Sequence, residues 1–407
     1  MTPFKPNITK SIDNLNILDR DLHLVYGDEL ETNIDNMLNN NIDNKTGSNL
    51  TYNNTVDSGK LDFDIIGNCE QDGTPTPDAP IPVKTVTGDN NVVIQNKNLL
   101  IIRERSANLG ITSTLNNDGS MTTQGTATAS GNAFITPTIN SEIKAGDYTL
   151  SISSPINKRI RFYVTYQDNT TQTSFINIGE TSTRLTLTKD VKSYNLVVVV
   201  NNGDIVNFTV IYQLEKGSTA TNCVAHKSQT YTIHLSNLEL AEIGDNRDEI
   251  DVENKKIIKK IGKVVLNGSE TWSTSLNTFR VGKSYIDNME ALDTNLISNQ
   301  YTFVNVETLE IGQAHIGAAN IIFKFDDGTM SVNDFKTWLA SNNLIIYYLL
   351  PEPVETPITD TTLIADLNSL YNDAVTYEGQ TNIITVPDTD NAQMILDVSL
   401  FVTEKEV

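Results

Sequence analysis

The stretch that decides the fold lies at residues 159–166 and reads RIRFYVTY. Apolar or aromatic side chains occupy every second position from Ile160 onward, and mostly polar side chains lie between them. Because successive side chains of a β-strand point to opposite faces, this alternation is typical of a strand with one buried face. A second run, LVVVV at 196–200, is apolar at every position and therefore indicates a central strand.

Strand patterns of this kind fill the middle of the chain. The runs at 148–153 and 206–214 alternate in the same way, and turn signals rich in Asn, Asp and Gly separate the runs. We therefore predict an antiparallel β-sandwich of the jelly-roll type between residues 96 and 226.

The flanking regions show a mixed pattern that favours a second β-domain with one or two short helices. Helices are expected at 331–342, with Ser331 as the N-cap, and at 361–371. The run LIIYYLL at 344–350 is expected to form a buried strand that ends at Pro351. Further strands are expected at residues 62–67, 228–243, 255–266, 301–323 and 381–386.

Three segments before the sandwich have other patterns. The prolines between residues 67 and 82 predict an extended strap, because each proline ring fixes φ and removes an N–H donor. The segment 84–95 predicts a hairpin with its tip at residues 89–91. Residues 28–38 predict a helix that docks either on its own chain or on another subunit.

Composition argues against several classes of protein. The chain of 407 residues carries 51 acidic and 29 basic side chains, so its net charge of −22 repels phosphate backbones and we expect no binding to nucleic acid. No apolar run reaches the length of about 18 residues that a membrane span needs, so we expect no membrane insertion. The first residues lack the apolar region of a secretion signal, and we expect no export by that route.

Neither a catalytic nor a metal-binding constellation stands out. Cys69 and Cys223 are too few for a disulfide framework, and the four histidines are not spaced as metal ligands. His226 follows Cys223 closely, but we interpret that pair as incidental. The triplet 326–328, Asp-Asp-Gly, is typical of a turn, and no serine-nucleophile or phosphate-loop motif is present. We expect no metal ion and no cofactor.

One strand face has the chemistry that a carbohydrate needs, namely flat aromatic or guanidinium groups beside hydrogen-bonding groups. Because strand side chains alternate, the polar residues of the 159–167 stretch project together. The predicted carbohydrate-binding residues are Arg159, Arg161, Tyr163 and Gln167 on this face, and Trp272 near a predicted loop. The alternatives are a solvated sheet face or a subunit contact for the first four, and packing within its own domain for the tryptophan.

The run KKIIKK at 255–260 is the one basic cluster in this acidic chain. It is interpreted either as a charged edge strand, which would discourage sheet-edge aggregation, or as an electrostatic contact with an acidic neighbouring copy.

A series of phrases follows the order of a known family. The series begins with GNCEQDGTPTPDAPIPVKTVTG at 67–88 and NKNLL at 96–100, and its later phrases lie at 116–128, 143–153, 213–221, 348–358 and 377–386. Together they resemble the tail-tip, baseplate and tail-fibre minor structural proteins of phages that infect Gram-positive bacteria. Asn96 stands where the family has Gly, and Cys69 stands where a small hydroxyl residue is commoner.

The resemblance implies a domain organisation. The implied parts are an N-terminal docking segment at 1–59, a discontinuous β-domain at 60–95 and 227–389, an inserted carbohydrate-binding-like jelly roll at 96–226, and a C-terminal tail at 390–407.

The resemblance also implies a function. We expect a virion protein without enzymatic activity, synthesised in the host cytoplasm, which assembles with copies of itself as a trimer. Its N-terminal region would dock on tail or baseplate proteins, and its jelly roll would bind host cell-wall glycan. The alternatives are a tail-associated enzyme that degrades wall polysaccharide and a bacterial surface adhesin, which the missing export signal disfavours.

Overall fold

The computed structural model of the chain is mainly β. It describes residues 46–53, 59–141, 143–286, 296–306, 308–326, 328–374 and 380–402. Strands make up 53% and helices 8% of the structure, so the predicted mainly β class with short helices is confirmed. The helix predicted at 28–38 lies outside the described residues.

The chain divides into two compact units. The first contains the chain up to Val93, Thr230–Thr376 and the chain from Ile383 onward. The second contains Ile94–Gln229, where the sequence predicted an insertion at 96–226. Asn382 also belongs to the second unit, because its side-chain amide donates to the Asn96 carbonyl oxygen at 3.1 Å.

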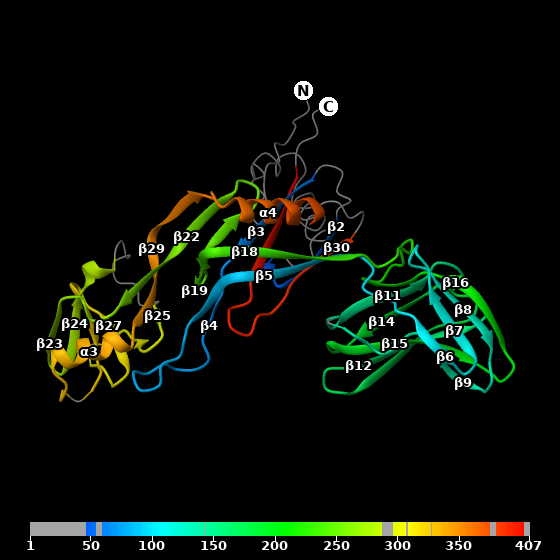
Figure 1. The fold of residues 1–407 in the computed structure, drawn as a ribbon, viewed down its shortest axis with the longest axis horizontal. Helices are drawn as coiled ribbons and strands as arrows, with labels where there is room; N and C mark the ends of the chain where they lie inside the picture. The colour runs from blue at the N-terminus through cyan, green and yellow to red at the C-terminus, as the bar shows by residue number, and fades with distance from the viewer. Residues whose placement is uncertain are drawn as a thin grey trace, which may run out of the picture. The chain divides into compact units, whose positions relative to one another are not determined.

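Three sheets build the second unit (Figure 1). The first has the order β10 (Ile139–Asn140), β15 (Val191–Val200), β12 (Arg159–Tyr166), β13 (Thr171–Ile176), and β9 (Gly131–Phe134) also pairs with β15. The second has the order β14 (Ser182–Leu187), β11 (Gly146–Ile152), β17 (Tyr212–Lys216). The third has the order β16 (Ile205–Val210), β8 (Met121–Thr126), β7 (Ile111–Leu115), β6 (Arg105–Asn108). The LVVVV run is therefore part of an interior strand, as predicted.

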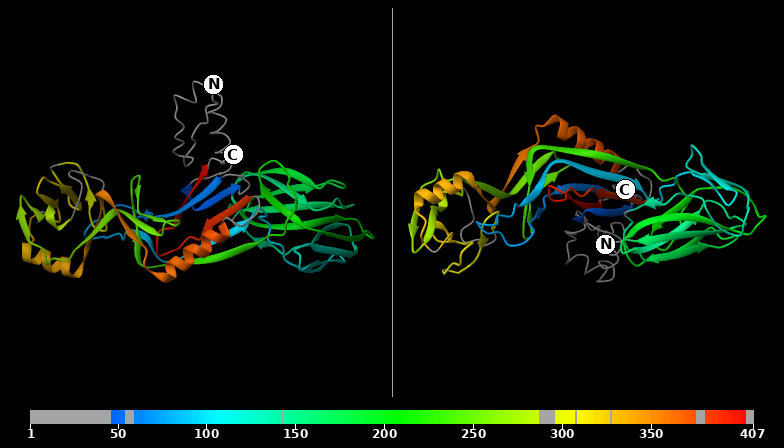
Figure 2. Two further views of the ribbon diagram at one scale, coloured as in Figure 1. Left: turned by 90° about the horizontal axis from the view of Figure 1, so that it is seen from above. Right: turned by 60° about the horizontal axis from the view of Figure 1, so that its bottom comes forward.

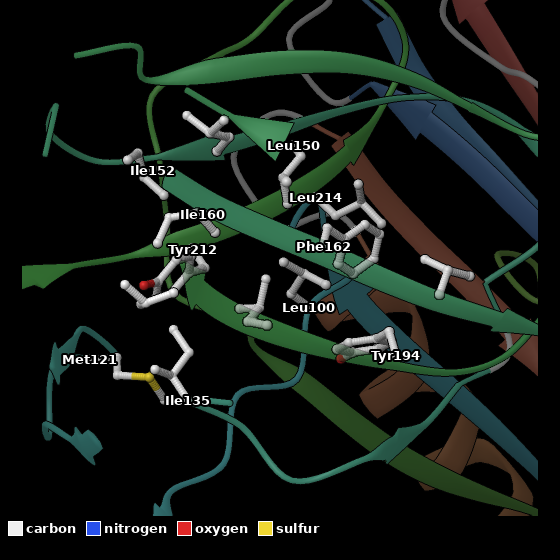
Figure 3. Packing of buried hydrophobic residues seen from close by; sticks show 14 of the residues in the cluster. Leu100, Met121, Ile135, Leu150, Ile152, Ile160, Phe162, Tyr194, Tyr212 and Leu214 are labelled. Carbon is white, nitrogen blue, oxygen red and sulfur yellow. The ribbon is translucent and has the colours of Figure 1, made fainter. Parts of the chain in front are cut away.

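A single core fills the second unit. Ile160, Phe162 and Val164 of β12 point into it and are at most 1% exposed. Figure 3 shows Phe162 beside Tyr194 of β15, and the ring centroids of this pair lie 5.6 Å apart. Full burial of a side chain of this size contributes about 1.5–3 kcal/mol. The alternation in the sequence thus identified the buried face of this strand.

Most remaining strands belong to the first unit. A seven-stranded antiparallel sheet has the order β1 (Thr46–Gly47), β31 (Ile395–Val402), β3 (Gly59–Ile66), β21 (Glu249–Asp251), β22 (Lys256–Leu266), β29 (Leu344–Pro357), β25 (Ile297–Ser298). Another sheet has the order β18 (Ser228–Leu240), β5 (Lys84–Asn96), β30 (Gln380–Thr385), β2 (Asn49–Asn53), with β4 (Cys69–Glu70) beside β5. A small sheet has the order β23 (Trp272–Ser275), β24 (Thr278–Gly282), β28 (Asn320–Phe323), β27 (Gln313–Ile316), β26 (Thr302–Phe303). A separate two-stranded sheet consists of β19 (Glu242–Ile243) and β20 (Asn246–Arg247).

Helix α3 (Val332–Ser341) forms where the sequence predicted it. The Ser331 hydroxyl oxygen accepts a hydrogen bond from the Asp334 backbone N–H at 3.2 Å, which caps the first turn. Phe335 and Leu339 are fully buried in one core with the small sheet, and Figure 1 shows α3 beside that sheet.

Helix α4 (Thr361–Ala374) is also confirmed and extends slightly beyond the predicted end. Leu363, Leu367 and Leu370 form its buried stripe, with no exposed surface. Asp360 accepts hydrogen bonds from two backbone N–H groups of the first turn. Figure 2 shows α4 lying along the sheets of the first unit.

The hairpin predicted at 84–95 is wrong, because these residues form the single strand β5. Gly88 has a φ of 66°, and the Asn90 side-chain amide donates to the carbonyl oxygens of Thr87 and Gly88 at 3.1 and 3.3 Å. The local turn chemistry is therefore satisfied inside a continuing strand. Pairing with β18 and β30 on its two sides keeps the strand extended.

The strand end predicted at Pro351 is also wrong. β29 continues to Pro357 and pairs Val354 with Lys259 of β22. The register shifts between Lys259 and Ile261, and such a bulge accommodates residues that lack an N–H donor.

The predicted terminal segments need a correction as well. Residues 395–402, predicted as part of a tail, form β31, and Leu396 and Val398 are fully buried where β31 pairs with β3. Residues 46–53, predicted as part of a docking segment, form β1 and β2. Burial of alternate apolar side chains explains why residues 395–402 join their sheet, and in β2 the side chain of Leu50 is fully buried.

The predicted strap at 67–82 contains one short strand, β4, and one bridge between Thr76 and Ala79. The Gln71 side-chain amide donates to the carbonyl oxygens of Ile81 and Ser298, each at 2.9 Å, and so fastens the segment to the first unit.

Candidate carbohydrate-binding face

The candidate site is one side of the sheet that contains β12. We call the outer face those side chains of β9, β10, β12, β13 and β15 that point away from the core, together with Arg105 of β6, which lies over the Phe134 ring of β9. Arg159, Arg161 and Tyr163 belong to it, because the residues between them enter the core. Gln167 follows the end of β12, is exposed, and donates from its amide to the Val191 carbonyl oxygen at 3.3 Å. The four predicted residues therefore lie in one unit, with Gln167 at the end of the strand.

Strand register places Arg161 in a row of apolar and aromatic side chains. Arg161 pairs with Phe175 of β13 on one side and with Val197 of β15 on the other. Val197 in turn pairs with Phe134 of β9. At a strand spacing of about 4.8 Å, a row across four strands is roughly 14 Å long. The row runs across the sheet, and because Val197 in its middle is only 1% exposed, its accessible surface comes from the half-buried Phe134, Arg161 and Phe175.

Three guanidinium groups lie over aromatic rings at the outer face. Such contacts stabilise exposed sites by about 0.5–1 kcal/mol each and orient the guanidinium group. The pairs, with the distance from the arginine Cζ to the ring centroid, are Arg161–Tyr163 (5.1 Å), Arg159–Phe175 (4.9 Å) and Arg105–Phe134 (5.5 Å).

Hydroxyl and amide groups flank the row. The Arg161 Nη2 donates to the Thr173 hydroxyl at 3.2 Å, whereas its Nε is buried and has no hydrogen-bond partner among the described residues. Asn195, which pairs with Tyr163, donates to the Thr138 hydroxyl at 3.3 Å. The face therefore combines ring faces, planar cations and small polar groups.

The prediction for Trp272 is wrong, because this side chain belongs to the core of the first unit. Its indole is 7% exposed and packs edge-on against Phe335 at 5.0 Å and against Phe323 at 5.8 Å. Its Nε1 donates to the carboxylate of Glu270 at 3.0 Å. An indole held this way leaves no ring face for a sugar.

Two acidic residues, Asp326 of the Asp-Asp-Gly triplet and the buried Asp248, have structural partners. Asp326 accepts hydrogen bonds from Gly328, Thr329 and Met330, and although burial raises the pKa of its carboxyl, these bonds lower it overall. Asp248 has no exposed surface and accepts from three backbone N–H groups as well as from Lys259. The neighbouring Asp327 lies outside the described residues.

Cys223 and His226 interact with different partners. The Cys223 Sγ lies 3.5 Å from the Ser151 hydroxyl, and burial raises the pKa of its thiol. The His226 Nδ1 lies 2.5 Å from the Asn98 carbonyl oxygen, and burial lowers the pKa of the imidazole. In the part of the chain that the structure describes, no three His, Cys, Asp or Glu side chains are grouped to hold a metal ion, and no helix is long and apolar enough to cross a membrane.

The interpretation of residues 255–260 as an edge strand is wrong. β22 lies between β21 and β29, and its lysines already have carboxylate partners within the chain. These ion pairs are Lys256–Glu355, Lys259–Asp248 and Lys260–Glu249. The cluster therefore gives no support to a contact with an acidic neighbouring copy.

Three residues of the outer face were missed in the sequence. Phe175 had a usable signal, because TQTSFI at 171–176 is short and ends in two apolar residues after alternating hydroxyls. Arg105 and Phe134 had none, since only the pairing of β9 with β15 brings Phe134 into this row, and Arg105 of β6 contributes only by lying over the Phe134 ring.

No protein-family model matches this chain. No curated protein and no solved structure matches it either. The proposals below therefore depend on the geometry of the outer face and on the ordered phrases of the sequence.

Proposed function

We propose that this chain is a non-enzymatic structural protein of a phage tail, located at the tail tip, baseplate or fibre, and that it contributes to host attachment by binding cell-wall carbohydrate. The ordered series of phrases in the sequence supports the virion role. The observation that carries the binding role is the row of Phe134, Arg161 and Phe175, with a guanidinium group stacked on each flanking ring.

The outer face suits a sugar for chemical reasons. A pyranose ring presents C–H groups that pack on aromatic faces, and hydroxyl groups that need donors and acceptors. Phe175 and Tyr163 are half-buried, so their rings are held by the sheet and yet retain surface. The half-buried Thr173 pairs with Tyr163 in the row next to Phe175, whereas Asn195, on the other side of Tyr163, is only 6% exposed.

We also propose that the protein assembles as a homotrimer and docks on other tail or baseplate proteins through its N-terminal region. The resemblance supports this arrangement.

The test is binding of the full-length protein to purified walls of Gram-positive bacteria and to a glycan array. We expect wall binding that Tyr163→Ala and Phe175→Ala each weaken about five- to tenfold, which corresponds to loss of one stacking contact. Ile205→Ala is the matched control, because Ile205 is 73% exposed on β16 in another sheet, and it should bind like the unmodified protein.

Two results would contradict the proposal. One is that the folded protein binds neither walls nor glycans. The other is that the pure protein releases reducing ends from wall polysaccharide, which would identify the alternative, a wall-degrading enzyme.

A further inference from the structure

We infer that the ligand of the outer face is an anionic polysaccharide whose carboxylate or phosphate groups pair with Arg105, Arg159 and Arg161. This inference rests on the proposed carbohydrate-binding role of the same face. It adds the charge of the ligand and the residues that bind its charged groups.

The charge of the outer face is opposite to that of the chain. Acidic side chains outnumber basic ones by 51 to 29 in the whole sequence, yet the outward positions of these strands include arginine and no aspartate or glutamate. These outward residues are Asn132, Phe134, Asn140, Arg159, Arg161, Tyr163, Thr165, Thr171, Thr173, Phe175, Ser193, Asn195, Val197 and Val199.

The arginines of this face also differ from other cations of the second unit in their partners. Among the described residues, no carboxylate oxygen lies within 4.0 Å of the guanidinium nitrogens of Arg105, Arg159 or Arg161. Each of them lies over an aromatic ring instead. Lysines of the same unit are neutralised within the chain, in the pairs Lys144–Asp190, Lys158–Asp204 and Lys189–Asp168.

Guanidinium chemistry determines which anion fits. An arginine stays charged at any pH that the protein survives, and its planar fork binds a carboxylate or a phosphate through two parallel hydrogen bonds. Stacking on a ring holds that fork in place, so less side-chain entropy is lost when a ligand binds. The repulsion from the rest of the chain is screened beyond about 10 Å at 0.1 M salt, whereas a direct contact is screened much less.

The outer face fits a polyhydroxylated chain better than a protein partner. The centre of a protein interface is usually apolar, but the aliphatic residue of the central row, Val197, is only 1% exposed. The large apolar side chains that the second unit does expose are Ile101, Ile178 and Ile205, and none belongs to the outer face. The outward polar residues that retain exposed surface are instead Asn132, Asn140, Thr165, Thr171 and Thr173.

The test measures binding of the full-length protein to three polymers of similar length: polygalacturonate, which carries carboxylates, poly(glycerol phosphate), which carries phosphates, and neutral dextran. We expect at least tenfold tighter binding to one of the two anionic polymers than to dextran. We also expect the affinity to fall at least tenfold between 50 and 500 mM NaCl, because ion pairs at a surface are screened by salt.

Three variants test which arginines bind the charged groups of the ligand. Arg159→Gln and Arg161→Gln should each weaken binding about ten- to a hundredfold, as expected for loss of a charge-assisted hydrogen bond. Arg184→Gln is the matched control, since Arg184 is exposed on β14 of another sheet, and it should leave binding unchanged. Circular dichroism and thermal unfolding establish that each variant is folded.

The outcomes separate this inference from the proposed function. Equal binding to dextran without salt dependence would overturn the inference and leave carbohydrate binding intact. Binding to none of the polymers overturns the inference, and wall binding in the preceding test then decides the proposed function separately. Equally tight binding to duplex DNA, or self-association in sedimentation that Arg161→Gln abolishes, would also overturn it and assign the face to another partner.

Discussion

Arg161 and Trp272 illustrate at the scale of single residues how the environment decides a role. The guanidinium of Arg161 lies over Tyr163 from its own strand and donates to Thr173 of the next, so two neighbours orient it while no carboxylate of the described residues pairs with its charge. Trp272 has the larger ring, but it packs against Phe335 and Phe323 and is only 7% exposed. A ring contributes to binding only where the fold leaves one of its faces uncovered.

Replacing Trp272 tests its assignment to the core. We expect Trp272→Ala to lower the free energy of unfolding by about 3–5 kcal/mol, because it leaves a cavity beside Phe335 and removes one of the three N–H donors to the buried Glu270. Urea denaturation measures the change. Glycan binding should stay the same in this variant, and a stable protein that has lost binding would show that the tryptophan belongs to the site after all.

Elements of the first unit are joined by both apolar and ionic contacts, and α4 is the clearest case. Its leucine stripe is buried, and Asp366 on its polar side accepts hydrogen bonds from the Nδ1 and the backbone N–H of His234 in β18, at 2.8 and 3.1 Å. Ser236 of β18 donates to Asp360 at the start of the helix at 2.9 Å. The helix is therefore fastened along its length to one strand.

The contact between α4 and β18 should depend on pH. The hydrogen bond to Asp366 raises the pKa of His234 above its ordinary value of 6.5, and Asp89 and Asp360 raise it further. A raised pKa in the folded state means that the stabilisation is fully present below pH 6.5 and is lost as the pH rises through the higher folded value.

Hydrogen exchange of the α4 backbone amides at pH values from 5.5 to 8.5 measures this loss. After correction for intrinsic exchange, protection should decrease with rising pH in the unmodified protein and should be flat in His234→Gln. The same pH dependence in both proteins would assign it to another group.

The whole molecule contains separate cores, and this should govern how it unfolds. Phe162 lies in the core of the second unit, whereas Phe335 lies in a core of the first. Because each core is closed within its unit, calorimetry should record more than one transition. We expect Phe162→Ala to lower the temperature of one transition on the order of 10 °C, from a cavity cost of about 3–5 kcal/mol, and Phe335→Ala to lower another. A common shift of all transitions in both variants would mean that the units unfold together.

Local periodicity was sufficient for much of the fold. The alternation at 159–166, the apolar run at 196–200 and the capped helix at 331–342 are properties of consecutive residues, so the sequence alone determined these elements and three residues of the outer face. It also predicted that the middle of the chain forms a unit of its own.

Contacts between distant residues decided the rest. β5 stays extended although its sequence contains a strong turn signal, because strands on both sides pair with it. β29 continues past Pro351 because a bulge in its pairing with β22 accommodates the proline, which has no N–H donor. Phe134 joins the row of Arg161 only through the pairing of β9 with β15, and Arg105 of β6 lies over the Phe134 ring. The order of residues along the chain shows which face of a strand is buried. Which side chains meet on the other face depends on strand pairing, because pairing joins residues that are far apart in the chain.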